Sequence, residues 1–349
     1  MPFALNDYSP EAQAAEFERR QLVPGPIQQP AWIDTCREVF GIDQDTLRFE
    51  IDDDSGYASA EFMRLRSAPS EPWRLIGVDE LHEPMDLVYD SLPALDQLTR
   101  QMIKSGELFR LGRIRADSPT IDSLERAAGR FGAVITRPTA NYPSIVLDDS
   151  WRVPESKLNS GRRSDYRRAQ KRALEWGALR FEVISPTPDA LPGLLEEAFQ
   201  VEARSWKGEA GTALLCDPVR AEFYRRYAAR ACAAGNLRLN FMYFGERLGA
   251  MQIAVEQDQA LWLLKVGYDT EFSRCSPGNL MIGETIRAAV ESGLSRYEFL
   301  GVSETWTRVW TETEHETVAV RVYPLGIANF SQLACDGVKS LWRNRRGDA

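Results

Sequence analysis

The sequence predicts an α/β (α+β) protein built on a mixed sheet, and two features of its second half carry this prediction. Three strand-like runs with a two-residue period follow one another at 237–244, 248–255 and 260–268, as in an antiparallel meander. A helical pattern then begins near Asn279 and is followed by a strand at 296–301. A strand, helix and strand of this length favour a parallel pair joined by a right-handed crossover. The sheet should therefore contain both antiparallel and parallel pairs.

The first half of the chain predicts an arm followed by a layered domain. Residues 1–30 contain three prolines and few large apolar side chains after Phe17, so we expect an N-terminal arm. Helical and strand-like patterns alternate over residues 31–150, which is typical of an independent α/β domain. The expected helices are 31–40, 92–104 and 121–130, and the expected strands are 47–51, 58–65, 73–78 and 108–114.

A proline-rich crossover at 138–156 leads into a second domain, which we expect to span residues 151–329, and residues 330–349 should form a helical basic tail. The basic tail is either frayed or a weak contact with an anionic membrane surface. Within the second domain we expect the following additional elements. The helices are 161–176, 190–206, 219–234 and 304–313, and the strands are 179–184 and 318–323.

Basic residues concentrate on the predicted helix 161–176, although the chain as a whole has a net charge of −9. One interpretation is a solvated helix face. The others are contact with a phosphate-bearing donor, with the acidic surface of an acyl carrier protein, or with anionic lipid. The acidic balance of the whole chain argues against DNA as a partner.

Composition also limits the class of protein. With 349 residues and 44% hydrophobic side chains, the chain can build two domains with sizeable cores. No run of 18 apolar residues and no signal-peptide pattern occur, so we expect a cytoplasmic protein. The five cysteines are scattered and form no cluster with the two histidines, so no metal is expected.

Several polar side chains near the predicted strands are candidates for catalysis. Lys265 stands in the middle of an apolar strand, so it must be paired, reach solvent or line a cleft. Pairing of Lys265 with Glu202 or Glu298 is the structural alternative. Tyr268 and Asp269 follow in the same segment and are candidates for proton transfer or substrate orientation.

Two further residues are candidate bases. Glu202 lies one turn before the end of its predicted helix and is expected to point to the same side as Trp206. His82 lies in a loop beside Glu83 and Asp86, where it is either a surface histidine or a base paired with a carboxylate.

The turn before the helix at Asn279 is a candidate anion site. Ser276-Pro277-Gly278-Asn279 places free backbone N–H groups and the positive end of the helix dipole at the carboxyl end of the third strand. A phosphate would fit there, whereas the alternative interpretation is a Pro-Gly turn that only starts a helix.

Four stretches together resemble the CelD/BioF2-like branch of GNAT-superfamily N-acyltransferases, which is related to the FemAB transferases. They are Arg204-Ser205-Trp206-Lys207-Gly208, Leu264-Lys265-Val266-Gly267-Tyr268-Asp269, Ser276-Pro277-Gly278 and Phe299-Leu300-Gly301. The resemblance covers about 150 to 325 and implies a mixed-sheet GNAT-like fold, with two GNAT-like halves in tandem. The usual phosphate signature, a Gln or Arg followed by spaced glycines, is replaced by Arg274-Cys275-Ser276-Pro277-Gly278.

The resemblance also implies an activity and a set of site residues. The expected function is transfer of an acyl group from a thioester, acyl-CoA or an acyl-carrier-protein thioester, to an amine on a small molecule, sugar or sphingoid-type lipid base. Aminoacyl transfer from tRNA to a peptidoglycan precursor, as in FemAB proteins, and a non-catalytic accessory role in polysaccharide synthesis are the alternatives. By this resemblance the donor is held by Arg274, Ser276, Gly278 and Asn279, and the acceptor by Trp206, Lys207 and Trp306.

Overall fold

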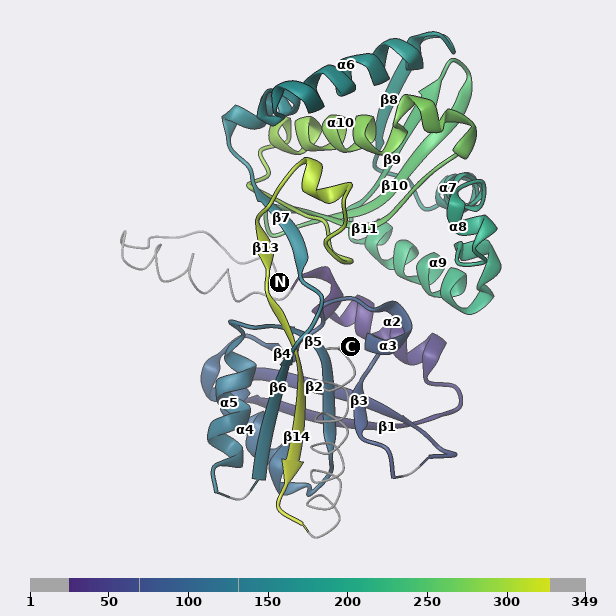
Figure 1. Ribbon diagram of the computed structural model, residues 1–349. Coiled ribbons are helices and arrows are strands. Elements are labelled where there is room, and N and C mark those ends of the chain that lie inside the picture. The colour runs from purple at the N-terminus through teal and green to yellow at the C-terminus, as the bar shows by residue number, and fades with distance from the viewer. Residues whose placement is uncertain (1–24, 69, 131, 327–349) are drawn as a thin grey trace, which may run out of the picture.

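The computed structural model describes residues 25–68, 70–130 and 132–326 and shows two stacked α/β units, each built on a mixed sheet (Figure 1). The first sheet has the strand order β1-β2-β3-β5-β14-β6, with β4 pairing with β2, and the second has the order β13-β7-β12-β11-β10-β9-β8. Within these sheets β3 runs parallel to β5 and β11 runs parallel to β12. The predicted α/β class with mixed sheets is confirmed. The predicted tail at 330–349 and most of the predicted arm at 1–30 lie outside the described residues.

The first unit covers one face of its sheet with two amphipathic helices. Ser91 and Ser118 start these helices, because each side chain accepts a backbone N–H of the first turn. Phe49, Phe62 and Phe109 pack together between the strands. The helices of this unit are α2 (Pro30–Phe40), α3 (Val78–Leu81), α4 (Leu92–Lys104) and α5 (Pro119–Ala128). Its strands are β1 (Gln44–Asp53), β2 (Gly56–Leu65), β3 (Trp73–Leu75), β4 (Val88–Tyr89), β5 (Phe109–Arg115), β6 (Gly132–Pro138) and β14 (Thr317–Pro324).

The second unit contains the predicted meander and crossover, and both are confirmed. Strands β9, β10 and β11 pair antiparallel in chain order, and α10 connects β11 to its parallel neighbour β12. The strands are β7 (Tyr142–Val146), β8 (Leu179–Ile184), β9 (Leu237–Phe244), β10 (Arg247–Gln257), β11 (Ala260–Tyr268), β12 (Arg296–Glu298) and β13 (Glu314–His315). The helices are α6 (Ser160–Leu174), α7 (Leu191–Ala203), α8 (Trp206–Glu209), α9 (Pro218–Ala233) and α10 (Pro277–Glu291).

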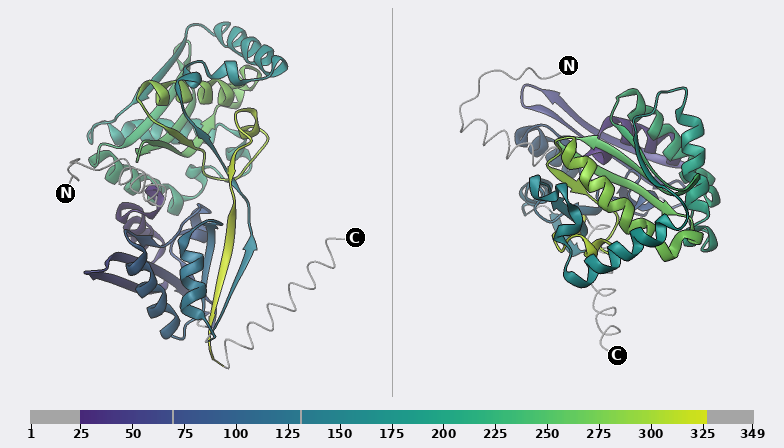
Figure 2. Two further views of the ribbon diagram at one scale, coloured as in Figure 1. Left: turned by 90° about the vertical axis from the view of Figure 1, so that its left-hand side faces the viewer. Right: turned by 90° about the horizontal axis from the view of Figure 1, so that it is seen from above.

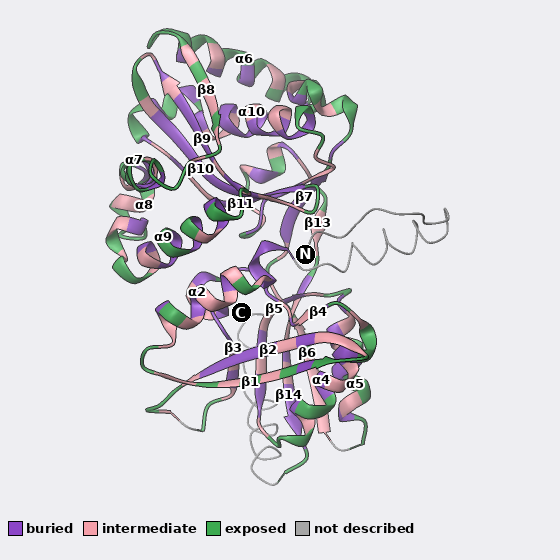
Figure 3. Cartoon of the chain, turned by 180° about the vertical axis from the view of Figure 1, so that it is seen from behind, coloured by how far each residue is buried: buried purple, intermediate pink, exposed green. Residues whose placement is uncertain are grey.

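Helices cover both faces of the second sheet. Helices α6 and α10 lie on one face, and α7, α8 and α9 lie on the other, toward the first unit (Figures 1 and 2). The apolar core on the α10 face is separate, whereas the core on the α7 and α9 face continues into the first unit. Buried residues accordingly line both sheets and the helices between them (Figure 3).

The two units are joined by side chains as well as by strands. Trp32 on α2 is fully buried and packs edge-on against Phe223 and Tyr227 of α9. On the same contact, Glu38 of α2 forms an ion pair with Arg230 of α9 at 2.6 Å. The sheets are also interlaced along the sequence, because β7 belongs to the second sheet and β14 returns to the first. The expected division of the chain near residue 150 stays a prediction.

The predicted helix at 304–313 is wrong, since only a 3-10 turn at Thr307–Val309 forms there. Side chains compete with the helix for its backbone groups: the Thr307 hydroxyl accepts the Glu304 N–H and donates to the Glu304 carbonyl. Across the described residues, none of the helices has the length and apolar character needed to traverse a lipid bilayer.

Candidate active site

A cleft of about 710 Å³ opens between the two units, and both units contribute residues to its lining. The first unit contributes the loop after α3 and one side chain of β5. The second contributes the ends of α7 and α9 together with β11, the N-terminus of α10 and the segment after β12. The lining side chains that carry polar or ionic groups are His82, Glu83, Arg113, Glu202, Ser205, Lys207, Thr212, Arg220, Lys265, Tyr268, Ser273, Ser276, Asn279 and Glu304.

The cleft exists because β11 and β12 stop pairing halfway. Their parallel ladder ends at Trp262 and Glu298, yet β11 continues to Tyr268. At the same place β11 carries one extra residue relative to β10, at Leu264, because Ile253 pairs with Lys265 and Ala254 with Leu263. Such a bulge leaves backbone groups outside the regular ladder. One edge of β11 therefore faces the cleft without a strand partner.

The N-terminus of α10 borders this open edge. Ser276 adopts a left-handed φ of 48° as the N-cap, and its side chain makes no capping hydrogen bond. A Cβ placed on Gly278 would meet only Tyr268 Cδ1, at 3.9 Å, so the approach to the first helical turn is open. Asn279 donates its backbone N–H to the Ser276 carbonyl at 3.1 Å, so Asn279 is inside the helix and is not its cap.

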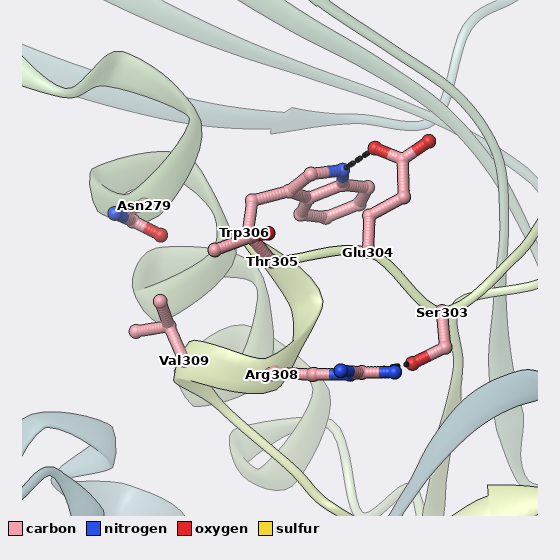
Figure 4. A pocket seen from close by; sticks show the side chains of 7 residues that line it. All are labelled: Asn279, Ser303, Glu304, Thr305, Trp306, Arg308 and Val309. Carbon is pink, nitrogen blue, oxygen red and sulfur yellow. Dashed lines mark hydrogen bonds between the residues drawn. The ribbon is translucent and has the colours of Figure 1, made fainter.

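A second hollow of about 610 Å³ continues from the cleft past Asn279 (Figure 4). Its wall is the segment Ser303–Val309, in which Trp306 Nε1 donates to Glu304 Oε2 at 2.6 Å and Arg308 Nε donates to Ser303 Oγ at 3.3 Å. The hollow therefore offers an indole and a guanidinium beside the start of α10 (Figure 4).

Lys265 is half-buried, and its ammonium lies beside α9. Its Nζ lies 4.9 Å from the ring centroid of Tyr224 on α9. Within the described chain its ammonium has no hydrogen bond and no ion pair within 4.0 Å. Burial and then the nearby charge of Lys207 lower the pKa of Lys265. The neutral amine is thus easier to form here than in water.

Glu83 is a buried carboxylate of the cleft that the sequence did not single out. It is only 5% exposed, and its Oε2 accepts the Gly301 N–H at 3.4 Å. Burial raises the pKa of Glu83, while the charge of Lys265 works in the opposite direction. The only signal in the sequence was its position next to His82, and that histidine is exposed at the rim of the cleft.

Arg113 on β5 fixes the geometry around Glu83. Its guanidinium donates to the carbonyls of His82 at 2.6 Å, Ala140 at 2.9 Å and Gly301 at 2.6 Å. Gly301 and the preceding Leu300 both have left-handed φ angles, of 55° and 52°. A left-handed Leu is strained unless its surroundings hold it. Arg113 and Glu83 therefore hold the turn after β12 in place from the first unit.

Glu202 lines the cleft, but both of its oxygens have partners. Oε1 lies 3.1 Å from Lys207 Nζ, and Oε2 accepts the Leu214 N–H at 2.9 Å. Lys207 also donates to the Val266 carbonyl at 2.7 Å, which ties α8 to β11. Glu298 pairs with His315 at 3.1 Å, so neither glutamate forms the ion pair with Lys265 that the structural alternative required.

Ten of the twelve predicted site residues line the cleft, and two do not. Asp269 is buried and accepts from Arg204 Nε at 2.7 Å, while its other oxygen caps Glu271. Arg274 lies outside the lining residues, and its carbonyl accepts from Arg172 at 3.1 Å. The ten residues that meet there are His82, Glu202, Trp206, Lys207, Lys265, Tyr268, Ser276, Gly278, Asn279 and Trp306.

Part of the basic face of α6 has a structural role. Arg162 donates to the carbonyls of Arg308 and Val309, and Arg163 donates to those of Ser156 and Leu158. Arg172 likewise holds the turn before α10. These arginines satisfy the carbonyls of neighbouring loops, so the charge on this helix is not all available to a partner.

Comparisons with known proteins agree with this geometry. A family model described as an acetyltransferase (GNAT) domain matches residues 160–308. Three solved structures share the fold over nearly the whole chain, each at 12% sequence identity. No curated protein matches the sequence significantly.

The first of these structures is a conserved protein of unknown function from Bacteroides thetaiotaomicron, with a TM-score of 0.57 over 88% of this chain and 97% of that one. FemX gives a TM-score of 0.56 over 90% and 96% of the two chains. The C-terminal domain of a lysylphosphatidylglycerol synthetase from Agrobacterium fabrum, itself assigned provisionally, gives 0.55 over 93% and 96%. At this identity the likeness shows a common fold.

Proposed function

We propose that the chain is an N-acyltransferase that moves an acyl group from a thioester donor to an amine, because a GNAT acetyltransferase family model matches residues 160–308. The observation that carries the proposal is the meeting of three features in one cleft. These are an unpaired strand edge on β11, an open helix N-terminus on α10, and a buried carboxylate, Glu83, near an ammonium, Lys265.

The donor fits along β11 and α10. The first-turn N–H groups of α10 and the positive end of its dipole suit a phosphate of acyl-CoA or of a carrier-protein phosphopantetheine. Gly278 leaves room for the phosphate because no side chain occupies the approach. The unpaired edge of β11 suits the amide groups of a pantetheine arm, which can pair with it as an added strand would.

The residues around Lys265 suit aminolysis of a thioester. The neutral nitrogen of the acceptor amine attacks the thioester carbonyl carbon and forms the new C–N bond, and Glu83 takes the proton that this nitrogen must lose. Backbone groups freed by the bulge at Leu264 are candidate donors to the developing oxyanion. The C–S bond then breaks, Tyr268, which lines the same cleft, supplies a proton to the leaving thiolate, and the tyrosinate regains a proton from solvent.

This assignment gives Glu202 and Trp206 supporting roles. Glu202 would have to break its contacts with Lys207 and Leu214 to accept a proton, so we assign it to holding α8 against β11. Trp206 is 55% exposed at the cleft rim, and with Trp306 it is available to contact an acceptor or the donor's nucleotide.

Aminoacyl transfer from tRNA is the second candidate, and the basic face of α6 is the observation that favours it. Arg167 and Lys171 on this face are exposed and have no partner within the described chain. Against it stand the net charge of −9 and the structural use of Arg162, Arg163 and Arg172. A purely accessory protein would have no need to keep Glu83 and Lys265 together in a cleft.

The test is a thiol-release assay with the full-length chain. Acetyl-CoA, longer acyl-CoAs and an acyl-carrier protein are offered with pooled amines, and free thiol and N-acyl product are measured by mass spectrometry. We expect turnover that depends on both donor and amine and falls strongly in Glu83→Gln. Salt-sensitive consumption of an aminoacyl-tRNA with no thioester consumed would instead support the second candidate, and no consumption of any donor would support the accessory role.

A further inference from the structure

Four cationic side chains line the cleft, and among the described residues two of them make no hydrogen bond to a carboxylate. Lys207 forms an ion pair with Glu202, and the guanidinium of Arg113 donates hydrogen bonds to three backbone carbonyls. Lys265 and Arg220 remain. Lys265 lies in the middle of β11 and Arg220 in the first turn of α9, and both line the cleft.

Arg220 is only 29% exposed and is weakly paired. Its Nε lies 3.6 Å from Asp217 Oδ2, while Asp217 Oδ1 already caps α9 by accepting the Arg220 backbone N–H. Among the described residues, the two terminal nitrogens of the guanidinium have no hydrogen bond. A guanidinium that keeps its fork free inside a cleft is suited to bind a planar carboxylate through two parallel hydrogen bonds.

Charges of both signs lie near these two residues. Burial and the charges of Lys207 and Arg220 lower the pKa of Lys265, whereas the charges of Glu202 and Glu83 raise it. Glu202 already pairs with Lys207, and among the described residues Lys265 makes no ion pair within 4.0 Å. Lys265 and Arg220 can therefore still accept a carboxylate.

The donor phosphate cannot be the group bound at this corner. The proposed phosphate site at Gly278 lies against Tyr268, three residues beyond Lys265 along β11. At about 3.3 Å per residue the two positions are roughly 10 Å apart. An anion bound between Lys265 and Arg220 is therefore a different group from this phosphate.

We propose that Lys265 and Arg220 bind a carboxylate of the acceptor, so that the acceptor is an amine that carries a carboxylate, as an amino acid does. This inference rests on the proposed acyl transfer. With its carboxylate between Lys265 and Arg220, the acceptor turns its amine toward Glu83, which lines the same cleft. Lys265 and Arg220 thus decide which amines are acylated.

The experiment compares matched acceptors that differ only in the anion. α-Amino acids and the corresponding α-amides are offered with acetyl-CoA, and kcat/KM is measured by thiol release. We expect the amino acids to be preferred at least about tenfold, which is roughly 1.4 kcal/mol. In Arg220→Gln the preference should fall below about threefold. Arg225→Gln, on the same helix but outside the cleft lining, should retain the preference.

A second arm does not depend on turnover. Trinitrobenzenesulfonate labels neutral amines, so Lys265 should react at pH 8, and peptide mass spectrometry follows its labelling. Amino acids, offered as N-acetyl derivatives so that no free amine consumes the reagent, should protect Lys265, whereas the N-acetylated amides should not, and the protection should be lost in Arg220→Gln.

The outcomes separate the inference from the proposed function. Protection by amino acids without acylation of any amine would support the anion site and overturn the acyl transfer. Acylation with equal rates for acids and amides, and no protection of Lys265, would overturn the inference and leave the acyl transfer intact. Absence of both protection and acylation would overturn both.

Discussion

Glu83 and Lys265 line the same cleft, and their pKa values are displaced in opposite directions. Burial raises the pKa of Glu83 and lowers that of Lys265, which favours the neutral form of each. Their mutual attraction favours the charged forms and limits both shifts. A base with a raised pKa in a cleft is suited to accept a proton near neutral pH.

Glu83→Gln removes this base and keeps the shape of the side chain. Loss of a positioned general base typically costs about 10²–10⁴ in rate, so we expect kcat to fall by that factor. The KM for acetyl-CoA should stay within about threefold, because Glu83 lies on the acceptor side. The acidic limb of the pH–rate profile should disappear with the carboxylate. A variant with the wild-type profile would remove Glu83 from the mechanism.

The same variant has an opposite effect on stability, with a sign set by the raised pKa. The stability linked to Glu83 is fully present below the unfolded-state pKa and is lost as pH rises through the folded-state pKa. Gln resembles the protonated form at every pH. Glu83→Gln should therefore melt above wild type at pH 8 and close to wild type at pH 4, as measured by calorimetry. A lower melting temperature at pH 8 would mean that the buried charge is favourable.

The N-terminus of α10 borders the cleft, and the middle of the helix packs in the core. Each of these two parts of the helix contains a glycine. Gly278 at its N-terminus has open space where a Cβ would stand. Gly283, five residues later, has none, because a Cβ there would overlap the Tyr166 hydroxyl and lie 3.2 Å from Trp310 Cη2. The two positions therefore respond differently to an added side chain.

Gly278→Val tests the donor site. The Cβ of the new side chain enters the approach to the first-turn N–H groups and meets only Tyr268 Cδ1, at 3.9 Å, so the fold should be preserved. We expect acetyl-CoA to bind at least about tenfold more weakly, or roughly 1.4 kcal/mol, by calorimetry. Asn279→Ala is the matched control, since its side chain does not cap the helix. Normal donor binding by folded Gly278→Val would place the phosphate elsewhere.

Gly283→Ala tests the packing of α6 on α10. Overpacking of this kind costs about 1–3 kcal/mol, so the midpoint of urea unfolding should fall. The Tyr166 hydroxyl is buried without a hydrogen-bond partner, so Tyr166→Phe alone should be neutral or stabilising. The double variant should recover part of the loss, because the overlapping oxygen is gone. Additive effects would show that the clash is relieved by another movement.

Periodicity predicted the elements well, and packing explains what it missed. The meander, α10 and α6 formed as expected because their apolar spacing alone specifies a buried face. Trp306 and Trp310 have helical spacing, but hydrogen bonds of Thr307 hold that segment in a 3-10 turn. Glu83 gave no signal beyond its position next to His82, since its burial and raised pKa arise only when the first unit packs against β11.

For the whole molecule, β14 determines how independent the first unit is. It lies between β5 and β6 and pairs antiparallel with both. Removing it would expose two strand edges in the middle of the sheet. The apolar core also continues from α2 into α9 and α7, so the full chain should unfold in one transition.

A pair of fragments tests this dependence. Residues 25–150 alone lack β14, and we expect no cooperative thermal transition by circular dichroism. In the second fragment, residue 138 is joined to residue 318 by Asn-Gly, a two-residue hairpin linker that suits the pairing of Pro138 with Val318. This fragment, ending at residue 324, should regain a cooperative transition. Cooperative unfolding of residues 25–150 would show that the sheet tolerates the missing strand.

The return of β14 to the first sheet also delays completion of that sheet during synthesis on the ribosome. From the end of β5 at Arg115 to the start of β14 at Thr317 the ribosome must add about 200 residues, which takes roughly 10–40 s. During this interval β5, and β6 once it has been synthesised, lack β14, the strand that lies between them in the sheet. The nascent first unit therefore needs shielding by a chaperone or by the emerging second unit, and Glu83 reaches its final place only after nearly the whole chain has been translated.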